Sequence, residues 1–283
     1  MPFGFRGNLL QVTAAFPNSN SETGKPVVLS ERRGPVLLLT LNRPDRMNGW
    51  TPDLEAAYFD LLDAGDADPK VRVFVVTGAG RAFCAGADMG RLRALSSGEA
   101  RMTARPRPKT HPLSIRKPIV AAINGACAGI GLLEALCCDV RFASREAKFT
   151  TAMARRGLIA EHGLSWLLPR VVGLADAVEL LLSGRVLLGD EAERLRLVHR
   201  SLPPEDVLPA ALDYAADLAE NCSPASLAAI KWQTYRHVDA SLAETLSESD
   251  PLMHDSVVGD DFKEGVASFT ERRAPRFAPL SAR

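Results

Sequence analysis

Two short segments rich in glycine and alanine contain the residue types in this sequence that could do chemistry. The first lies within Arg81 to Met89 and reads Ala85-Gly86-Ala87, and the second lies within Ile123 to Gly131 and reads Ala128-Gly129-Ile130. Small residues let a ligand approach the main chain closely. Two backbone N–H groups that converge on one point form an oxyanion hole, which stabilises negative charge on a carbonyl oxygen. The sequence predicts that the two segments build such a hole together.

Buried strands are needed to hold these two turns. The first turn segment follows the apolar run Val71 to Thr77, and the second follows the run Pro118 to Ile123. Val36 to Leu41 and Val140 to Phe142 are two more apolar runs of strand length. Because nearly continuous apolar strands alternate with helical patterns, the sequence predicts an α/β core whose sheet is covered on both faces.

Helices are expected between and after these strands. Thr51 as N-cap and Pro52 at the first helical position predict one helix start. The segment Gly129 to Cys138 carries leucines at helical spacing, and the unpaired N–H groups at its N-terminus suit a developing negative charge. Asp190 and Glu193 are expected to act as a capping pair for a later helix. Further helices are expected over residues 175–182, 190–197 and 260–273.

The composition limits the class of protein. A chain of 283 residues with 46% hydrophobic residues can bury one large core. Because 34 Lys and Arg balance 34 Asp and Glu, no overall field would hold nucleic acid or a membrane surface. Residues 1–25 carry no signal-peptide pattern and are expected to form a flexible tail. The five cysteines form no C-x-x-C pair, which argues against disulfides and a metal site and favours the cytoplasm.

A basic segment lies between Met89 and Lys117, where arginines and lysines gather among prolines without an apolar period. One interpretation is a solvated loop, which is the usual fate of a charge-rich stretch. The other is a mobile lid whose basic groups meet the phosphates of a polyanionic ligand. In both interpretations the segment borders the predicted oxyanion turns.

Four ordered motifs resemble the crotonase, or enoyl-CoA hydratase/isomerase, superfamily. They are Leu41 to Asn48, Thr77 to Asp88, Ile123 to Asp139 and Glu264 to Arg273. The resemblance implies a crotonase spiral of ββα units, with a core over residues 26–207 that holds a CoA-thioester site and a C-terminal helical trimerisation region over 208–283. It also implies an acyl-CoA substrate, no cofactor beyond the coenzyme A of that substrate, and a homotrimer or a hexamer made of two trimers.

The resemblance also assigns site residues by position. The N–H groups of Ala87 and Ile130 would form the oxyanion hole, although the family usually has glycine at the second position. Arg43 and Arg46 would contact the nucleotide end of CoA, and Phe269 and Arg272 would reach a CoA from a neighbouring subunit. The residues expected to line the substrate path are Ala85, Gly86, Asp88, Met89, Gly90, Leu133 and Met153.

Departures from the family pattern bear on the reaction. Hydratases of this family use two glutamates to hold and deliver a water molecule, and those positions read Leu133 and Met153 here. Glu134 is one residue from the first position, which turns it about 100° away on a helix. We expect Glu134 to be partly exposed or held in a salt bridge.

Glu161 falls where some isomerases of the family carry a single glutamate. One base could take a proton from the carbon beside the thioester and return it two carbons along, without activated water. Burial against Leu158, Leu164 and Trp166 would strengthen this base. The alternative is that Glu161 caps the next helix or pairs with an arginine. His162 is expected to be a surface histidine.

The favoured function is therefore double-bond isomerisation of an enoyl-CoA. The alternatives are an enoyl-CoA hydratase that uses Glu161 or Glu134, and a non-catalytic acyl-CoA-binding protein. Gly78-Ala79-Gly80 hints at a dinucleotide-binding turn, but its third glycine is missing. Cys84 has no histidine patterned to activate it, so we expect it to be a small buried apolar residue.

Overall fold

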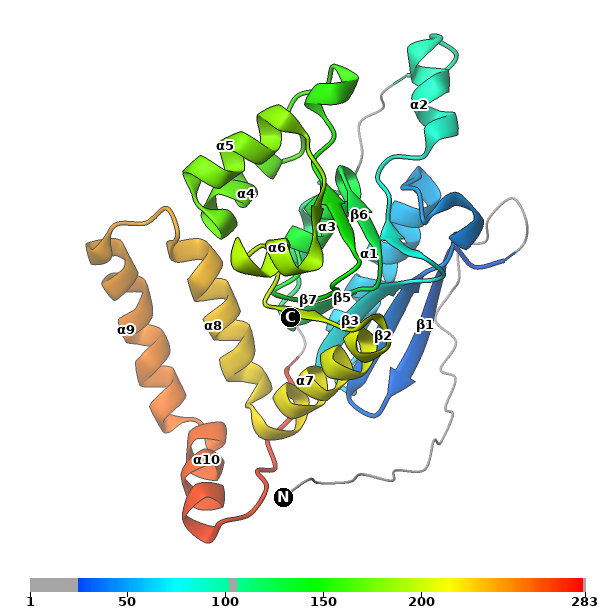
Figure 1. Cartoon of the computed structure of the whole chain (residues 1–283). Coiled ribbons are helices and arrows are strands. Elements are labelled where there is room, and N and C mark those ends of the chain that lie inside the picture. The colour runs from blue at the N-terminus through cyan, green and yellow to red at the C-terminus, as the bar shows by residue number, and fades with distance from the viewer. Residues whose placement is uncertain (1–24, 102–105, 282–283) are drawn as a thin grey trace.

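The computed structural model describes residues 25–101 and 106–281, and it is built on two sheets (Figure 1). The larger sheet has the strand order β1-β2-β3-β5-β7-β10, with all neighbours parallel except the β1–β2 pair. Its strands are β1 (Val28–Arg33), β2 (Val36–Leu41), β3 (Val73–Gly78), β5 (Ile119–Ile123), β7 (Val140–Ser144) and β10 (Arg200–Leu202). The predicted α/β class is confirmed, while the tail expected over residues 1–25 lies almost wholly outside the described residues.

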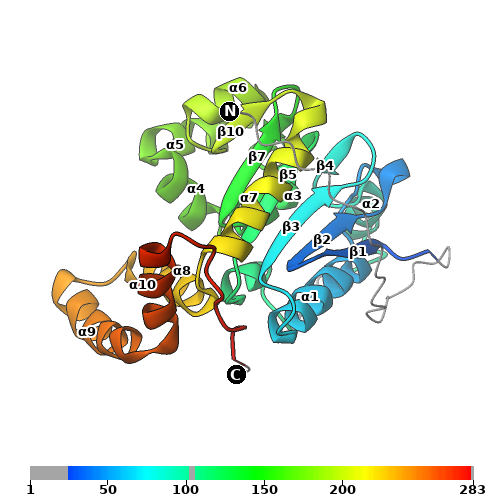
Figure 2. The same ribbon diagram turned by 90° about the horizontal axis from the view of Figure 1, so that it is seen from below.

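The six-stranded sheet divides the hydrophobic core in two, because successive side chains of a strand point to opposite faces. Leu37 and Leu39 face helix α1 (Pro52–Ala67), together with Phe74 of β3. Val36 and Leu38 face the other way and pack with helix α7 (Val207–Asn221), which runs across that face (Figure 2). Cover on both faces explains why β3 and β5 are buried along their whole length.

The second sheet is made of much shorter strands in the order β4-β6-β8-β9. These are β4 (Ala82–Cys84), β6 (Ala126–Ala128), β8 (Lys148–Thr150) and β9 (Leu187–Leu188). The chain enters β4 from β3 and β6 from β5 through tight turns. A Cβ atom added at Gly78 would lie 2.1 Å from the Ala82 carbonyl oxygen, and one added at Gly125 would lie 2.2 Å from that of Arg81. Both turns therefore require glycine.

The remaining helices follow the strands in chain order. They are α2 (Met89–Ser96), α3 (Ile130–Leu136), α4 (Leu164–Val172), α5 (Leu174–Ser183), α6 (Gly189–Arg194), α8 (Pro224–His237), α9 (Leu242–Val258) and α10 (Asp260–Glu271). The start of α1 is as predicted, with the Thr51 side chain accepting from the Leu54 N–H. The predicted Asp190–Glu193 capping pair is wrong, because both carboxylates accept hydrogen bonds from Ser201 of β10 instead.

Helices α8, α9 and α10 lie to one side of the two sheets (Figures 1 and 2). Asp139 fastens α8 to the core: its carboxylate accepts from the Ile119 N–H at 2.7 Å, from Lys231 Nζ at 2.8 Å and from the Tyr235 hydroxyl at 2.9 Å. After α10 the chain returns to the core, where Arg72 donates to the Phe277 carbonyl oxygen. The division at residue 208 stays a prediction, and α7 lies on the sheet of the preceding region.

Candidate active site

The two glycine-rich turns lie side by side because β4 and β6 are parallel neighbours. Ala82 pairs with Ala126 and Cys84 with Cys127, so both strands end at the same edge. The turns thus follow the two short strands and not the long strands that the sequence suggested. A Cβ atom at Gly131 would lie 2.1 Å from the Cys84 carbonyl oxygen. This close approach presses the start of α3 against the end of β4.

Each turn bends at a glycine with a positive φ, and the next residue presents its amide. Gly86 has φ 103° and Gly129 has φ 51°. Ile130 begins α3, so its N–H has no partner within the helix. On the other turn, Trp50 donates to the Gly86 carbonyl and accepts from Asp88, which passes over the amide of Ala87. In the described part of the chain neither amide, Ala87 or Ile130, donates to a protein acceptor.

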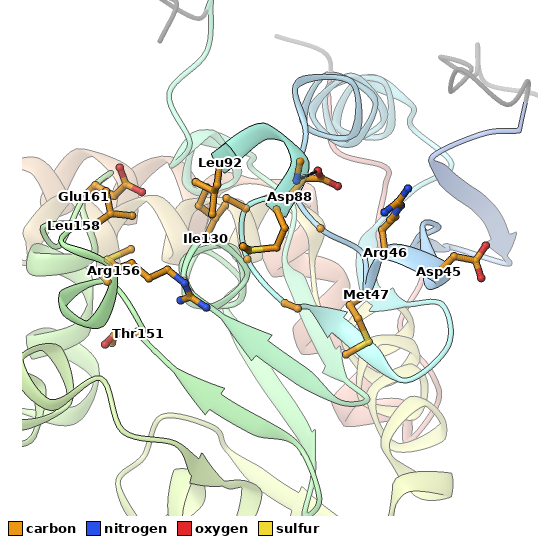
Figure 3. Close-up of a pocket in the computed structure, with 18 residues that line it drawn as sticks. Asp45, Arg46, Met47, Asp88, Leu92, Ile130, Thr151, Arg156, Leu158 and Glu161 are labelled. Atoms are coloured by element: carbon orange, nitrogen blue, oxygen red, sulfur yellow. Dashed lines mark hydrogen bonds between the residues drawn. The ribbon is translucent and has the colours of Figure 1, made fainter. Parts of the chain in front are cut away.

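A cavity of about 440 Å³ opens beside these two amides (Figure 3). Figure 3 shows Glu161 and Leu158 on one side of it, Ile130 in the middle and Asp88 on the other side. Ten predicted site residues line it: Arg46, Ala85, Gly86, Ala87, Asp88, Met89, Gly90, Ile130, Met153 and Glu161. The turns, Met153 and Glu161 therefore share one cavity wall.

A second cavity of about 340 Å³ adjoins the first. The two share five wall residues, namely Ala87, Leu92, Ile130, Leu158 and Glu161. The second cavity adds an apolar wall from Trp50, Leu95 and Pro108. Glu161 is the one acidic residue on that wall and the one acidic residue common to both cavities.

Glu161 lies in the turn that precedes α4, with 28% of its side chain exposed. The expected burial is incomplete, since Leu158 and Ile159 on the same segment are exposed. The arginines considered as partners are engaged elsewhere: Arg155 donates to the Ser183 carbonyl and Arg170 to Asp239. The neighbouring imidazole is closer than expected, with His162 Nε2 at 3.2 Å from Glu161 Oε2.

The sequence matches the model of the enoyl-CoA hydratase/isomerase family over residues 31–279. The chain belongs to this family. It is 35% identical over 265 residues to a probable enoyl-CoA hydratase of Mycobacterium bovis, an alignment that covers 89% of this chain and 92% of that protein. It is 32% identical to the 1,2-epoxyphenylacetyl-CoA isomerase of Escherichia coli, covering 88% of this chain and 97% of that protein.

Solved structures agree with this assignment. A putative enoyl-CoA hydratase of Streptomyces coelicolor superposes with a TM-score of 0.83 at 30% identity, covering 94% of this chain and 98% of that one. The crotonase fold predicted from the motifs is confirmed, and the chain is an enzyme of the hydratase/isomerase family. An acyl-CoA thioester is the class of substrate that fits this family.

Arg43, which the family resemblance assigns to the nucleotide end of CoA, acts here as a brace under the first turn. Its guanidinium donates to the Gly49 carbonyl oxygen and, at 3.1 Å, to Asp88 Oδ2, and Arg43 is not among the residues that line either cavity. Asp88 also accepts from the Gly90 and Arg91 N–H groups at the start of α2. Partial burial disfavours its charge, but Arg43 and these N–H groups outweigh burial and lower the pKa of Asp88 below its usual value.

The two positions on α3 where an acid was considered both point into the core. Leu133 is fully buried and lines neither cavity. The expectation that Glu134 is exposed or in a salt bridge is wrong, because it is 2% exposed and its carboxyl oxygens lack a hydrogen-bond partner in the described structure. Burial strongly raises the pKa of Glu134, so the side chain is a neutral acid at pH 7.

Phe269 and Arg272 do not reach the site within one chain. Both lie at the end of α10, on the helical arm beyond the sheets (Figure 1). Phe269 is 87% exposed and borders a separate groove between α8, α9 and α10. A contact with CoA through these residues would need a second copy of the chain.

Several wall residues were not singled out from the sequence. Arg156 lines the first cavity, and Trp50, Arg91, Arg107 and Lys109 line the second. The last three belong to the basic segment, whose composition was the one available signal. Trp50 and Arg156 gave none, because their roles depend on how distant loops fold back.

The second half of the basic segment is bound to acids of α1. Lys109 pairs with Glu55, and Arg107 pairs with Asp60 and Asp63 at 2.5 and 2.7 Å. Continuing along the segment, His111 contacts Asp63 and Arg116 contacts Asp66. We call residues 107–116 the α1 strap. Its cations are neutralised by α1, which differs from both the solvated loop and the phosphate-binding lid.

Other chemistry has little support within residues 25–101 and 106–281. Cys84 is buried, and burial raises its pKa to about 12, which is unsuited to a nucleophile. No group of three or more His, Cys, Asp or Glu side chains in these ranges could hold a metal ion. None of the helices described there is long and apolar enough to span a bilayer.

Proposed function

We propose that the protein isomerises the double bond of a 3-enoyl-CoA to give the 2-enoyl-CoA, with Glu161 as its single acid–base group. One observation carries the proposal: Glu161 is the carboxylate that lines both cavities beside Ala87 and Ile130. The other acidic residues on the first cavity are Asp45 and Asp88, and Asp88 is held by Arg43.

The reaction would proceed in two proton transfers. The Glu161 carboxylate takes a proton from the carbon next to the thioester, and the electron pair moves into a dienolate whose oxygen accepts from the Ala87 and Ile130 N–H groups. The carboxylic acid then returns the proton to the carbon two positions along, which leaves the double bond conjugated with the thioester. No water is consumed, so Leu133 and Met153 in place of hydratase glutamates do not prevent this reaction.

The first cavity supports binding of the CoA part. Arg46 and Arg156 bring two cations to its wall, and phosphates pair well with guanidinium groups. We also propose that the chains assemble as a trimer or a hexamer. Phe269 and Arg272 would then approach the CoA of a neighbouring subunit. The second cavity, with its apolar wall, would take the acyl group.

Hydration of a 2-enoyl-CoA is the second candidate, because several relatives are named as probable hydratases. Glu161 would then have to position the water alone, since Glu134 does not line either cavity. A binding protein without turnover is the third candidate, for the same reason that two hydratase glutamates are missing.

The test is mass analysis of products after incubation with matched 2-enoyl and 3-enoyl thioesters, using the unchanged protein and Glu161→Ala. Isomer formation that disappears in Glu161→Ala supports the proposal. A product heavier by one water supports hydration, and absence of any turnover supports the binding role. Asp45→Ala serves as the control, since it removes a carboxylate from the first cavity only.

A further inference from the structure

The turn that presents Glu161 contains two successive residues in the left-handed region. His162 has φ 57° and Gly163 has φ 88°. Glycine adopts this conformation readily, but histidine does so with strain. Non-glycine residues held in this way often occur where a side chain must be aimed. The conformation of His162 therefore raises the question of what its imidazole is aimed at.

The imidazole points at the proposed base. His162 Nε2 lies 3.2 Å from Glu161 Oε2, although side chains of adjacent residues commonly diverge. Both side chains are half-buried and both line the second cavity. The imidazole thus shares the cavity wall with the carboxylate whose orientation matters for proton transfer.

Other cations near Glu161 are engaged elsewhere. On the wall of the second cavity, Arg107 pairs with Asp60 and Asp63, and Lys109 pairs with Glu55. On the wall of the first cavity, Arg156 donates to the Ala152 carbonyl oxygen. Arg91 lines the second cavity from α2, across from the turn. The nearest donor recorded for Glu161 is therefore His162.

We propose that His162 is a positioning residue for Glu161, an inference that rests on the proposed function. In the tautomer that carries its proton on Nε2, His162 donates to Glu161 Oε2. This hydrogen bond fixes the carboxylate plane and leaves Oε1 directed at the substrate. His162 forms no bond to substrate, and the same carboxylate oxygen takes up the proton and returns it.

A positioning role predicts an effect on the rate of proton transfer and little effect on binding. A misplaced base lowers kcat, because alignment with the carbon acid is lost. KM should change little, since the CoA contacts lie elsewhere. A matched pair of variants separates the imidazole from the turn: His162→Gly keeps the left-handed turn without a donor, and His162→Gln keeps a side-chain N–H donor.

The experiment measures kcat and KM with a 3-enoyl-CoA, and also the exchange of the α-proton of a saturated acyl-CoA in D2O, which reports proton abstraction alone. We expect His162→Gly to lower kcat and α-proton exchange by about 10- to 100-fold, the usual effect of a lost hydrogen bond to a charged group. His162→Gln should retain most of both, with unchanged KM and melting temperature.

Three results overturn the inference. Full activity of His162→Gly shows that the turn alone suffices, and equal losses in the Gly and Gln variants show that donation is not the role. A further fall in exchange when His162→Gly is added to Glu161→Ala shows that His162 acts independently of Glu161. If either single variant melts early, this comparison in the Glu161→Ala background still decides the matter. Full turnover by Glu161→Ala would instead reject the proposed function.

Discussion

Glu134 is an unusual residue because it is an acid in the core without a hydrogen-bond partner. Its carboxyl lies near the buried Tyr58, whose hydroxyl also lacks a partner among the described residues. Lys109 and Glu55 interact with it electrostatically, in opposite directions. A buried carboxyl of this kind stays protonated and weakens the fold once it is forced to ionise.

We predict that Glu134→Gln stabilises the protein more at pH 8 than at pH 5. A carboxyl whose pKa is raised by folding contributes fully below its unfolded pKa of about 4.3, and that contribution is lost as pH rises towards the folded value. The neutral amide avoids this loss, which we expect to be about 1 to 3 kcal/mol. Urea unfolding at the two pH values measures it.

Glu205→Gln is the control for the Glu134 prediction, because Glu205 is an exposed glutamate. It should leave the difference between pH 5 and pH 8 unchanged. An equal response of the two variants would contradict the assignment of Glu134 as a buried neutral acid.

The residue scale also shows what sequence reasoning can reach. Ala87, Ile130 and Glu161 were identified from residue types and motif positions, and the structure places them on shared cavity walls. The burial of Glu134 could not be predicted, since it depends on Lys109 and Glu55 being brought to the same place. Adjacent positions such as Leu133 and Glu134 look different on a helical wheel, but here both are buried.

At the scale of elements, the second sheet decides the site, and its strands were the least predictable. β4 and β6 contain three residues each, too few for a periodic pattern. Long strands such as β2 and β5 were predicted within their bounds, because apolar runs of five or six residues are informative. The pairing of β4 with β6 brings the two turns together, and it depends on glycines that tolerate close backbone contact.

Gly131→Ala should therefore disturb the site from within α3. The added methyl group would meet the Cys84 carbonyl oxygen at 2.1 Å, so α3 must shift and carry the Ile130 amide with it. We expect a loss of about 1 to 3 kcal/mol in stability, typical of overpacking, and a fall in kcat greater than the change in KM. Steady-state kinetics and urea unfolding test this.

Gly265→Ala in α10 is the matched control for Gly131→Ala, because its nearest heavy atom would be 3.9 Å away. The control should be neutral or slightly stabilising, as expected for alanine in a helix. Normal kcat in Gly131→Ala would show that the position of α3 does not govern the oxyanion hole.

The α1 strap yields a prediction about ion pairs of different burial. The Lys109–Glu55 pair is buried, and Glu55 also accepts from the Trp50 indole N–H at 2.8 Å. Lys109→Met leaves Glu55 as an uncompensated buried charge, which costs about 3 to 5 kcal/mol. Adding Glu55→Gln should recover part of this stability, since the amide still accepts from Trp50. Denaturant unfolding of the single and double variants measures the recovery.

Arg107→Gln provides the contrast, because its partners Asp60 and Asp63 are largely exposed. We expect it to cost less than about 1 kcal/mol, and less still at high salt. Similar losses for Lys109→Met and Arg107→Gln would contradict the distinction between buried and exposed pairs in the strap.

For the whole molecule, the helical arm exposes more apolar surface than one chain needs. Leu242 and Met253 of α9 and Phe269 of α10 are exposed by 74%, 63% and 87%. A groove of about 900 Å³ runs between α8, α9 and α10. Exposed apolar patches of this size mark interaction sites. Sequence motifs indicated an assembly, but which side chains remain uncovered in one chain became visible only in the structure.

We predict that Phe269→Glu dissociates the assembly and lowers activity at the same time. A charge in place of an exposed aromatic disfavours burial against another copy, and it also removes the aromatic ring that is proposed to reach a neighbour's CoA. Light scattering coupled to size-exclusion chromatography gives the mass, and KM for the thioester gives the site effect. Leu29→Glu, an exposed apolar position on β1, should change neither.

Arg272→Gln separates the two roles of this end of α10. Arg272 is exposed and makes no contact with the rest of its own described chain that would hold the arm together. If it reaches the CoA of a neighbour, its loss raises KM while the mass of the assembly stays unchanged. If mass and KM both stay unchanged, α10 serves assembly alone, and the CoA site is complete within one chain.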